Sequence, residues 1–202
     1  MKNIGFTELF NKHKAQGDDD LLIWDFAETP KISSYIFNLC AGEYNMIANT
    51  RSDSPTPMRI FVRESKKAYV DTDLVFRVVT DGVKFYQNMF DCPFPFDKYD
   101  IIYCPEFRIT AMENVGAITF TDRILLPADE LDDNIKTIHY KVHLHELAHM
   151  WFGDLTTMVW WNDLWLKESF ADFLCATSFI ESAYKEDPDT FSSVDQIWTG
   201  FI

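Results

Sequence analysis

The chain has 202 residues, of which 47% are hydrophobic and 16% aromatic, so it can bury a substantial core and is too apolar for intrinsic disorder. Its 32 acidic and 18 basic residues give a formal net charge of -14, which repels nucleic acid and anionic membranes, and we expect no nucleic-acid partner. No run approaches the roughly 18 apolar residues of a membrane span, and the amino-terminal MKNIGFTELFNKHKAQGDDD has no apolar export region. We therefore expect neither a membrane span nor an export signal.

The four cysteines lie far apart, at Cys40, Cys92, Cys104 and Cys175, and none belongs to a C-x-x-C pair. Metal-binding and redox-active cysteine pairs usually have that close spacing. This pattern indicates a reducing compartment, so the cytoplasm is the predicted location.

Short β-type runs occupy the first third of the chain. The runs are LLIWDFAE (21–28), YIFNLCAGEY (35–44) and MRIFVRE (58–64), and turn-like TPK and RSDSPTP separate them. We expect residues 1–55 to be the end of an amino-terminal β domain and residues 56–202 to belong to a catalytic domain.

Longer elements follow RSDSPTP. The hydrophobic spacing predicts a helix over 71–91 and strands over 99–107 and 115–122. Two further helices are predicted, one from Asp132 to Phe152 that ends at Gly153, and one from Asn162 or Asp163 to about Tyr184. Strands followed by helices indicate an α+β fold with a mixed sheet.

The segment HELAH places His145 and His149 four residues apart in a predicted helix, with Glu146 directly after the first histidine. Residues four apart lie one turn apart on the same face, so both imidazoles can reach one metal ion. Glu146 lies about 100° round the helix, where it can contact a metal-bound water without being a ligand. An ordinary amphipathic helix is the alternative, because three fixed positions also coincide by chance.

A second pair, His139 and His143 in HYKVH, has the same spacing without the glutamate. Eighteen residues separate His149 from Glu168, whereas the same step from His143 leads to Asn162. We therefore interpret His139 and His143 as solvated or structural residues.

Two imidazoles and one carboxylate, with a fourth position left for water, are typical of a catalytic rather than a structural zinc site. The residues therefore predict one Zn²⁺ per chain, bound by His145, His149 and Glu168, with Glu146 as the general base.

The segment TAMENVGAITF (110–120) contains a single carboxylate, Glu113, among apolar residues. A carboxylate in such surroundings needs a cationic partner. Taken alone, Glu113 fits a surface turn residue paired with a lysine or arginine.

The chain resembles the zinc aminopeptidases of the aminopeptidase N and puromycin-sensitive type in three motifs. These are HELAH with Glu168 after eighteen intervening residues, AMENVG, and WWNDLWLKESFADF. FAETPKISSYIFNLCAGEY is similar to the end of that family's amino-terminal β domain. The remaining residues are similar to the first half of its thermolysin-like catalytic domain. The resemblance implies the same roles for His145, His149, Glu168 and Glu146 that their spacing predicts.

The resemblance also implies a substrate-binding segment formed by Ala111, Met112, Glu113 and Asn114. In it Glu113 would hold the free α-amino group of the substrate. The strand after it would pair with the extended peptide backbone, with Gly116 permitting close approach.

Several residues depart from the family pattern. Thr110 stands where the family usually has glycine, and Lys167 replaces the usual asparagine before the ligand glutamate. We expect Lys167 to point away from the metal, since an inward charge would weaken zinc binding. Asp172 could orient a zinc-bound histidine, although an exposed aspartate is the favoured interpretation. The three tryptophans of the last motif are expected to pack between the two helices: Trp160, Trp161 and Trp165.

The expected function is that of a zinc aminopeptidase, which hydrolyses peptides with a free amino terminus by metal-activated water. The family's oxyanion-stabilising tyrosine would lie beyond Ile202 and its second amine-binding glutamate upstream, so we expect the chain to be a fragment. The rival hypothesis is a truncated, non-catalytic zinc-binding chain that binds peptide amino ends or a partner polypeptide. Among enzymes, a thermolysin-like endopeptidase is the second choice, and Glu113 disfavours it.

Overall fold

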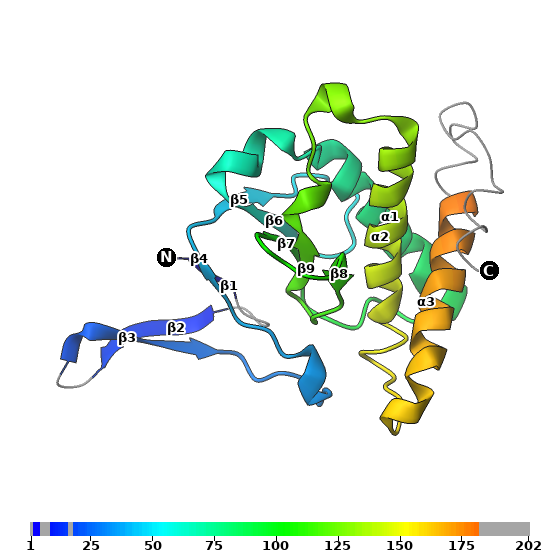
Figure 1. Cartoon of the computed structure of the whole chain (residues 1–202). Helices are drawn as coiled ribbons and strands as arrows, with labels where there is room; N and C mark the ends of the chain where they lie inside the picture. The colour runs from blue at the N-terminus through cyan, green and yellow to red at the C-terminus, as the bar shows by residue number, and fades with distance from the viewer. Residues whose placement is uncertain (1, 5–8, 16–17, 182–202) are drawn as a thin grey trace.

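A five-stranded mixed sheet lies at the centre of the structure, a computed structural model that describes residues 2–4, 9–15 and 18–181 (Figure 1). The strands in spatial order are β5 (Asn45–Ala48), β6 (Met58–Val62), β7 (Tyr99–Cys104), β9 (Ile118–Thr121) and β8 (Ala111–Met112). The three central strands run parallel, and the outer strands β5 and β8 are antiparallel to their neighbours. The strands predicted within 58–64, 99–107 and 115–122 are these three central strands.

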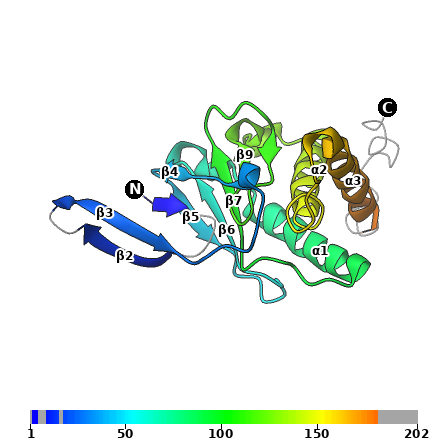
Figure 2. The ribbon, with the colours of Figure 1, turned by 90° about the horizontal axis from the view of Figure 1, so that it is seen from below.

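Three α-helices cover one side of the sheet: α1 (Thr72–Phe90), α2 (Asp133–His149) and α3 (Leu164–Phe179) (Figures 1 and 2). α1 is the crossover between the parallel strands β6 and β7, which cannot be joined by a tight turn. α2 packs against both α1 and α3. The mixed sheet with its helical layer confirms the predicted α+β fold class. None of the helices in the described residues is both long and apolar enough to cross a membrane.

Close packing fixes the position of α2 over the sheet. A Cβ atom at Gly82 of α1 would lie 2.6 Å from Leu144 Cδ2 and 2.7 Å from Leu147 Cδ2, so α1 and α2 approach closely only with glycine here. One turn before Leu144 on α2, the ring of Tyr140 packs edge-on against Phe179 of α3, with ring centroids 5.3 Å apart. Both contacts hold the helix that carries the HELAH motif.

The amino-terminal part forms two small antiparallel pairs. β2 (Leu9–Ala15) and β3 (Asp18–Phe26) make a hairpin that projects from the central sheet, and β1 (Lys2–Ile4) pairs with β4 (Cys40–Gly42) (Figure 1). The run predicted as a strand over 35–44 is only partly extended, because a 3₁₀ turn (Ser34–Ile36) precedes β4. β5 joins the central sheet through β6, and a domain boundary after residue 55 remains a prediction.

The helix ends follow local hydrogen bonding. Asp71 caps α1 by accepting a bond from the Leu74 amide at 3.0 Å, and Asp132 caps α2 by accepting one from the Ile135 amide at 2.8 Å. α2 ends at His149, three residues before the predicted end, because the chain turns toward Gly153, whose φ of 141° is open mainly to glycine. α3 begins near the predicted start, and the predicted end at Tyr184 lies outside the described residues.

Candidate active site

His145 and His149 lie in the last turns of α2, and Glu168 lies in the second turn of α3, which runs antiparallel to it. The two Nε2 atoms are 3.1 Å apart, and Glu168 Oε2 is 3.4 Å from His145 Nε2 and 3.5 Å from His149 Nε2. Donors that bind zinc tetrahedrally at about 2.0–2.2 Å are separated by about 3.3–3.6 Å. The two edges to Glu168 lie in this range and the edge between the imidazoles, at 3.1 Å, is slightly shorter, so the triangle has about the size that a zinc ion requires.

Each histidine is oriented through its other ring nitrogen. His145 Nδ1 lies 2.8 Å from Asp172 Oδ1, and His149 Nδ1 lies 2.9 Å from the carbonyl oxygen of Phe152. Both partners are acceptors, so each Nδ1 carries the proton and each Nε2 lone pair is directed at the common centre. Asp172 is exposed, as predicted, and its carboxylate also holds the His145 ring, which is the other role that the sequence allowed.

Negative charge makes this triangle attractive to a cation. Burial lowers the pKa of His145, but the carboxylates of Asp172 and Glu168 raise it more, to about 10. The same histidines hold the pKa of Glu168 far below its ordinary value. A metal ion at this position would replace a proton, which is how cation sites built from imidazole and carboxylate groups bind metal.

Glu146 is buried beside the triangle, and its Oε2 atom has no hydrogen-bond partner within the described part of the chain. Burial raises the pKa of its carboxyl group to about 8. Burial of a carboxylate oxygen without a hydrogen-bond partner destabilises the fold unless a bound ion or water contacts that oxygen. A cation and its bound water would supply this contact, so the residues fit a metal centre.

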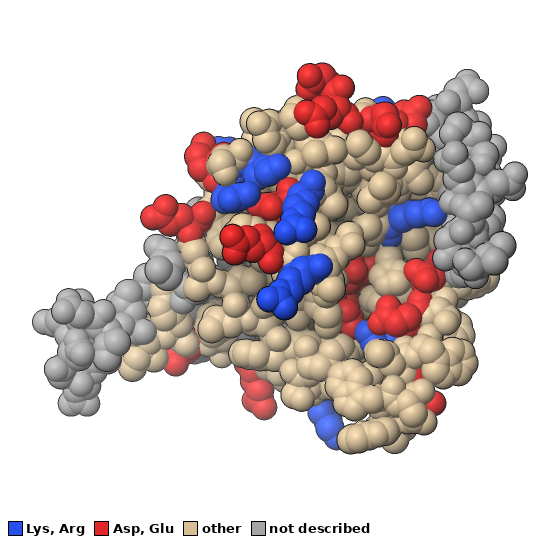
Figure 3. Space-filling view, in the orientation of Figure 1, with Lys and Arg blue, Asp and Glu red and all other residues tan. Residues whose placement is uncertain are grey.

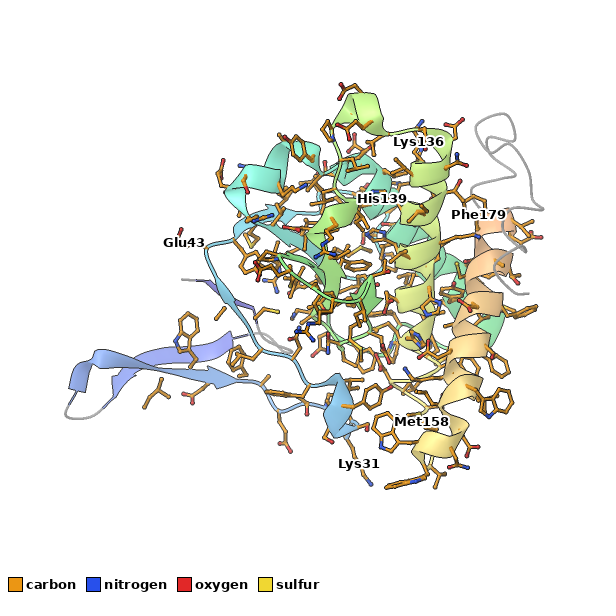
Figure 4. The ribbon with its side chains drawn as sticks, viewed as in Figure 1. Lys31, Glu43, Lys136, His139, Met158 and Phe179 are labelled. Carbon is orange, nitrogen blue, oxygen red and sulfur yellow. The ribbon has the colours of Figure 1, made fainter. Side chains whose placement is uncertain are left out.

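The second histidine pair is structural, and neither member approaches the triangle. His143 Nε2 and Tyr103 Oη share a hydrogen bond of 3.0 Å, and the His143 ring stacks on the ring of Phe120. His139 bonds the carbonyl oxygen of Ile124 at 2.9 Å on the upper half of α2 (Figure 4). Both side chains are buried, so the structural interpretation holds and the solvated one does not.

A cleft of about 340 Å³ lies next to the triangle, and Figure 3 shows acidic side chains gathered around a hollow over the lower halves of α2 and α3. Ala111, Met112 and Glu113 line this cleft. Asn114 does not, because its side chain bonds the Ile36 carbonyl at 3.3 Å and accepts from Thr119 Oγ1 at 2.8 Å. Three of the four residues predicted to bind substrate therefore face the cleft.

Lys167 is turned inward, contrary to the prediction. Its Nζ atom contacts Glu113 Oε1, lies 2.8 Å from Glu168 Oε1, and stands 5.1 Å from the ring centroid of Tyr35. Lys167 is 7% exposed and Glu113 4% exposed, so the pair is buried. Burial lowers the pKa of Lys167, but the Glu113 carboxylate more than offsets this and raises it. Glu113 draws the lysine inward because a buried carboxylate requires a cation.

The edge of the sheet at the cleft is β8. β9 has neighbours on both sides, so the expectation that it pairs with a peptide backbone is wrong. β8 carries Ala111 and Met112 and, in the part of the chain that the structure describes, has β9 as its one neighbour. An added strand could therefore join the sheet at β8. Gly116 has a φ of 65°, a conformation that favours glycine, in the turn between these strands.

Aromatic residues complete the cleft. Trp160, Trp161 and Trp165 are 68%, 52% and 63% exposed, so the prediction that they pack between the helices is wrong. Trp161 lines the cleft and meets the ring of Tyr35 edge-on, with centroids 5.4 Å apart. Tyr35 was missed as a site residue, because it belongs to the amino-terminal β-type run and no local motif marks it.

Comparisons with known proteins match this chain to a family of peptidases. Residues 75–199 match the peptidase family M1 domain. The chain is 37% identical over 199 residues to aminopeptidase N of Streptomyces lividans, covering 96% of the chain and 23% of that protein. It is 38% identical over 154 residues to puromycin-sensitive aminopeptidase of Caenorhabditis elegans, covering 74% of the chain and 16% of that protein.

A third relative is tricorn protease-interacting factor F2 of Thermoplasma acidophilum, at 34% identity over 180 residues, with 89% of the chain and 21% of that protein covered. The chain thus spans about a fifth of the length of these curated relatives. The family match covers well over half of the chain and includes every residue of the histidine and glutamate triangle. The chain belongs to peptidase family M1.

Proposed function

We propose that this chain carries the metal centre of a zinc aminopeptidase, which removes amino-terminal residues from unblocked peptides. The observation that carries the proposal is the triangle of His145 Nε2, His149 Nε2 and Glu168 Oε2, with edges of 3.1–3.5 Å, beside a buried Glu146 oxygen without a partner. The names of the relatives support the reaction class. A cytoplasmic location remains a prediction from the cysteine pattern.

The roles of the residues follow from their positions. His145, His149 and Glu168 would hold one zinc ion, which supplies a Lewis acid and lowers the pKa of water when bound. Glu146 would accept a proton from the attacking water and return it to the leaving amine. Asp172 keeps the His145 ring in the ligating orientation.

Substrate orientation is assigned to Glu113 and the β8 edge, which line the same cleft. Glu113 would bind the α-ammonium group, and the β8 edge at Ala111 and Met112 would bind the extended backbone. An ammonium fixed on Glu113 permits only the first peptide bond to reach the metal. This arrangement favours an aminopeptidase over an endopeptidase.

The test compares Glu146→Gln with Glu130→Gln, a matched change at an exposed position, in the complete gene product. Glu146 makes no metal bond in this assignment, so the variant should keep its zinc while turnover of an aminoacyl fluorogenic substrate falls by about 10²-fold to 10⁴-fold. Glu130→Gln should change neither quantity.

Two results would contradict the proposal. Loss of zinc together with activity in Glu146→Gln would make Glu146 a ligand or a structural residue. Zinc binding without any hydrolysis by the unaltered complete protein would favour the rival hypothesis, a non-catalytic zinc-binding chain.

A further inference from the structure

We propose that the Lys167 side chain is a built-in occupant of the amine-binding position on Glu113, and that it thereby sets how strongly the site binds a peptide with a free amino end. The proposal rests on the proposed role of Glu113 as the amine anchor. It assigns to Lys167 a role in substrate selectivity, because any incoming ammonium group has to displace the lysine ammonium from the same carboxylate.

The contacts of Lys167 Nζ are those that would recognise a peptide ammonium group. The nitrogen touches Glu113 Oε1, lies 2.8 Å from Glu168 Oε1, and stands over the face of Tyr35 at 5.1 Å. Two carboxylates and an aromatic face are the usual surroundings of a bound primary ammonium. The side chain of Lys167 thus presents to Glu113 the same chemical group as the amino end of a substrate.

The side chain of Lys167 is buried, with the residue as a whole 7% exposed. It extends from α3 into the cleft, where it ends at Glu113. Because the lysine is tethered, its ammonium competes with a peptide amine at a high effective concentration.

Charge makes the competition exclusive. Glu113 is 4% exposed and Lys167 Nζ already contacts its Oε1 atom, so an ammonium group that binds Glu113 would lie beside a second positive charge. Two ammonium groups at the same buried carboxylate would repel each other strongly where water cannot screen them. Binding of a free amino end therefore requires Lys167 to leave Glu113, and the affinity is reduced by the cost of that displacement.

The test measures peptide binding by calorimetry on the metal-free chain, so it does not depend on catalysis. The probes are Leu-Gly-Gly amide and its acetylated counterpart. Lys167→Gln should raise the preference for the unblocked peptide about ten-fold to a hundred-fold, the value of one charge-assisted hydrogen bond. Lys167→Arg keeps the charge and should leave the preference near that of the unaltered chain.

A second measurement covers the case in which removal of the lysine destabilises the fold. In Lys167→Ala, ethylammonium should enter the vacated position and raise the thermal unfolding midpoint, whereas tetramethylammonium, which has no N–H group, should not. The Glu113→Gln/Lys167→Ala double variant should lose the response to ethylammonium. Equal responses to the two cations in Lys167→Ala would overturn the proposal.

The outcomes separate this inference from the proposed function. If unblocked peptides are preferred and Lys167→Gln leaves that preference unchanged, Lys167 is not an occupant of the amine position and the inference is wrong. If neither the unaltered chain nor Lys167→Gln distinguishes the two peptides, Glu113 is not the amine anchor, and the proposed function fails first.

Discussion

The Nδ1 atom of His145 lies 2.8 Å from Oδ1 of Asp172, although the two residues are on different helices. This hydrogen bond joins α2 to α3 next to Glu168 and leaves His145 Nε2 free to face the metal position. The side chain of Asp172 is 53% exposed, so its position depends on the hydrogen bond with His145 and not on burial.

The first prediction follows from this contact. Asp172→Asn removes the charge that orients His145 without removing a metal ligand, and we expect zinc affinity to fall about 10-fold to 100-fold. Competition with a chelating dye measures the affinity. Asp129→Asn, at an exposed position on the 3₁₀ turn before α2, is the control and should leave it unchanged. A normal zinc affinity in Asp172→Asn would exclude the orienting role.

The second prediction concerns the inward lysine. Lys167 Nζ lies 2.8 Å from a ligand carboxylate, so its positive charge opposes a divalent cation at the same site. Lys167→Asn should therefore raise zinc affinity, by about ten-fold or more. The same dye competition measures it, with Lys136→Asn on the exposed face of α2 as the control. Unchanged or weaker zinc binding in Lys167→Asn would show that the lysine charge does not reach the metal.

The third prediction concerns pH and the structural histidine pair. Burial lowers the pKa of His139 below its ordinary value of 6.5. The Ile124 carbonyl and the Asp71 carboxylate act in the opposite direction but do not offset burial. The ring of His143 stacks beside that of His139. The Nδ1 atom of His139 is buried and has no partner among the described residues, so protonation would bury an unpaired N–H group. The unfolded chain therefore binds this proton first as the pH falls.

Neutral His139 makes its whole contribution to the free energy of unfolding above pH 6.5, and this contribution is lost as the pH falls below that value. His139→Gln can still donate to the Ile124 carbonyl but does not titrate. Between pH 7.5 and 5.5, the unaltered chain should lose up to about 1.4 kcal/mol more unfolding free energy than the variant, measured in urea. Equal losses in the two proteins would mean that His139 takes up its proton without cost in the folded state.

The metal triangle could be predicted because its information is local. Helical periodicity alone puts His145 and His149 on one face, and the composition of the ligand set selects Glu168 over Asn162. The three central strands were predictable for a similar reason, because they are short runs rich in β-branched and aromatic residues. β1 and β2 were not, since MKNIGFTELFNKHKAQGDDD has charges scattered through it and no alternating pattern.

The orientation of Lys167 could not be predicted, because it depends on a partner 54 residues earlier in the chain. Helix geometry places its Cα next to Glu168, but only the buried Glu113 carboxylate determines which way the long side chain turns. The position of β8 at the edge of the sheet could not be predicted either. It depends on the pairing of Ala111 with Phe120 and of Met112 with Thr119, which forms only in the folded chain. Only the folded chain shows that Trp161 faces the cleft, where Tyr35 meets it.

The zinc content of the purified chain after dialysis tests the central claim most directly. We expect one zinc per chain in the unaltered protein and in His139→Gln, and close to none in His149→Ala, with folding of each protein checked by circular dichroism. The two variants form a matched pair, since each removes one histidine of an i, i+4 pair on the same helix. Full zinc occupancy in a folded His149→Ala, or loss of zinc in a folded His139→Gln, would contradict the assignment of the metal site.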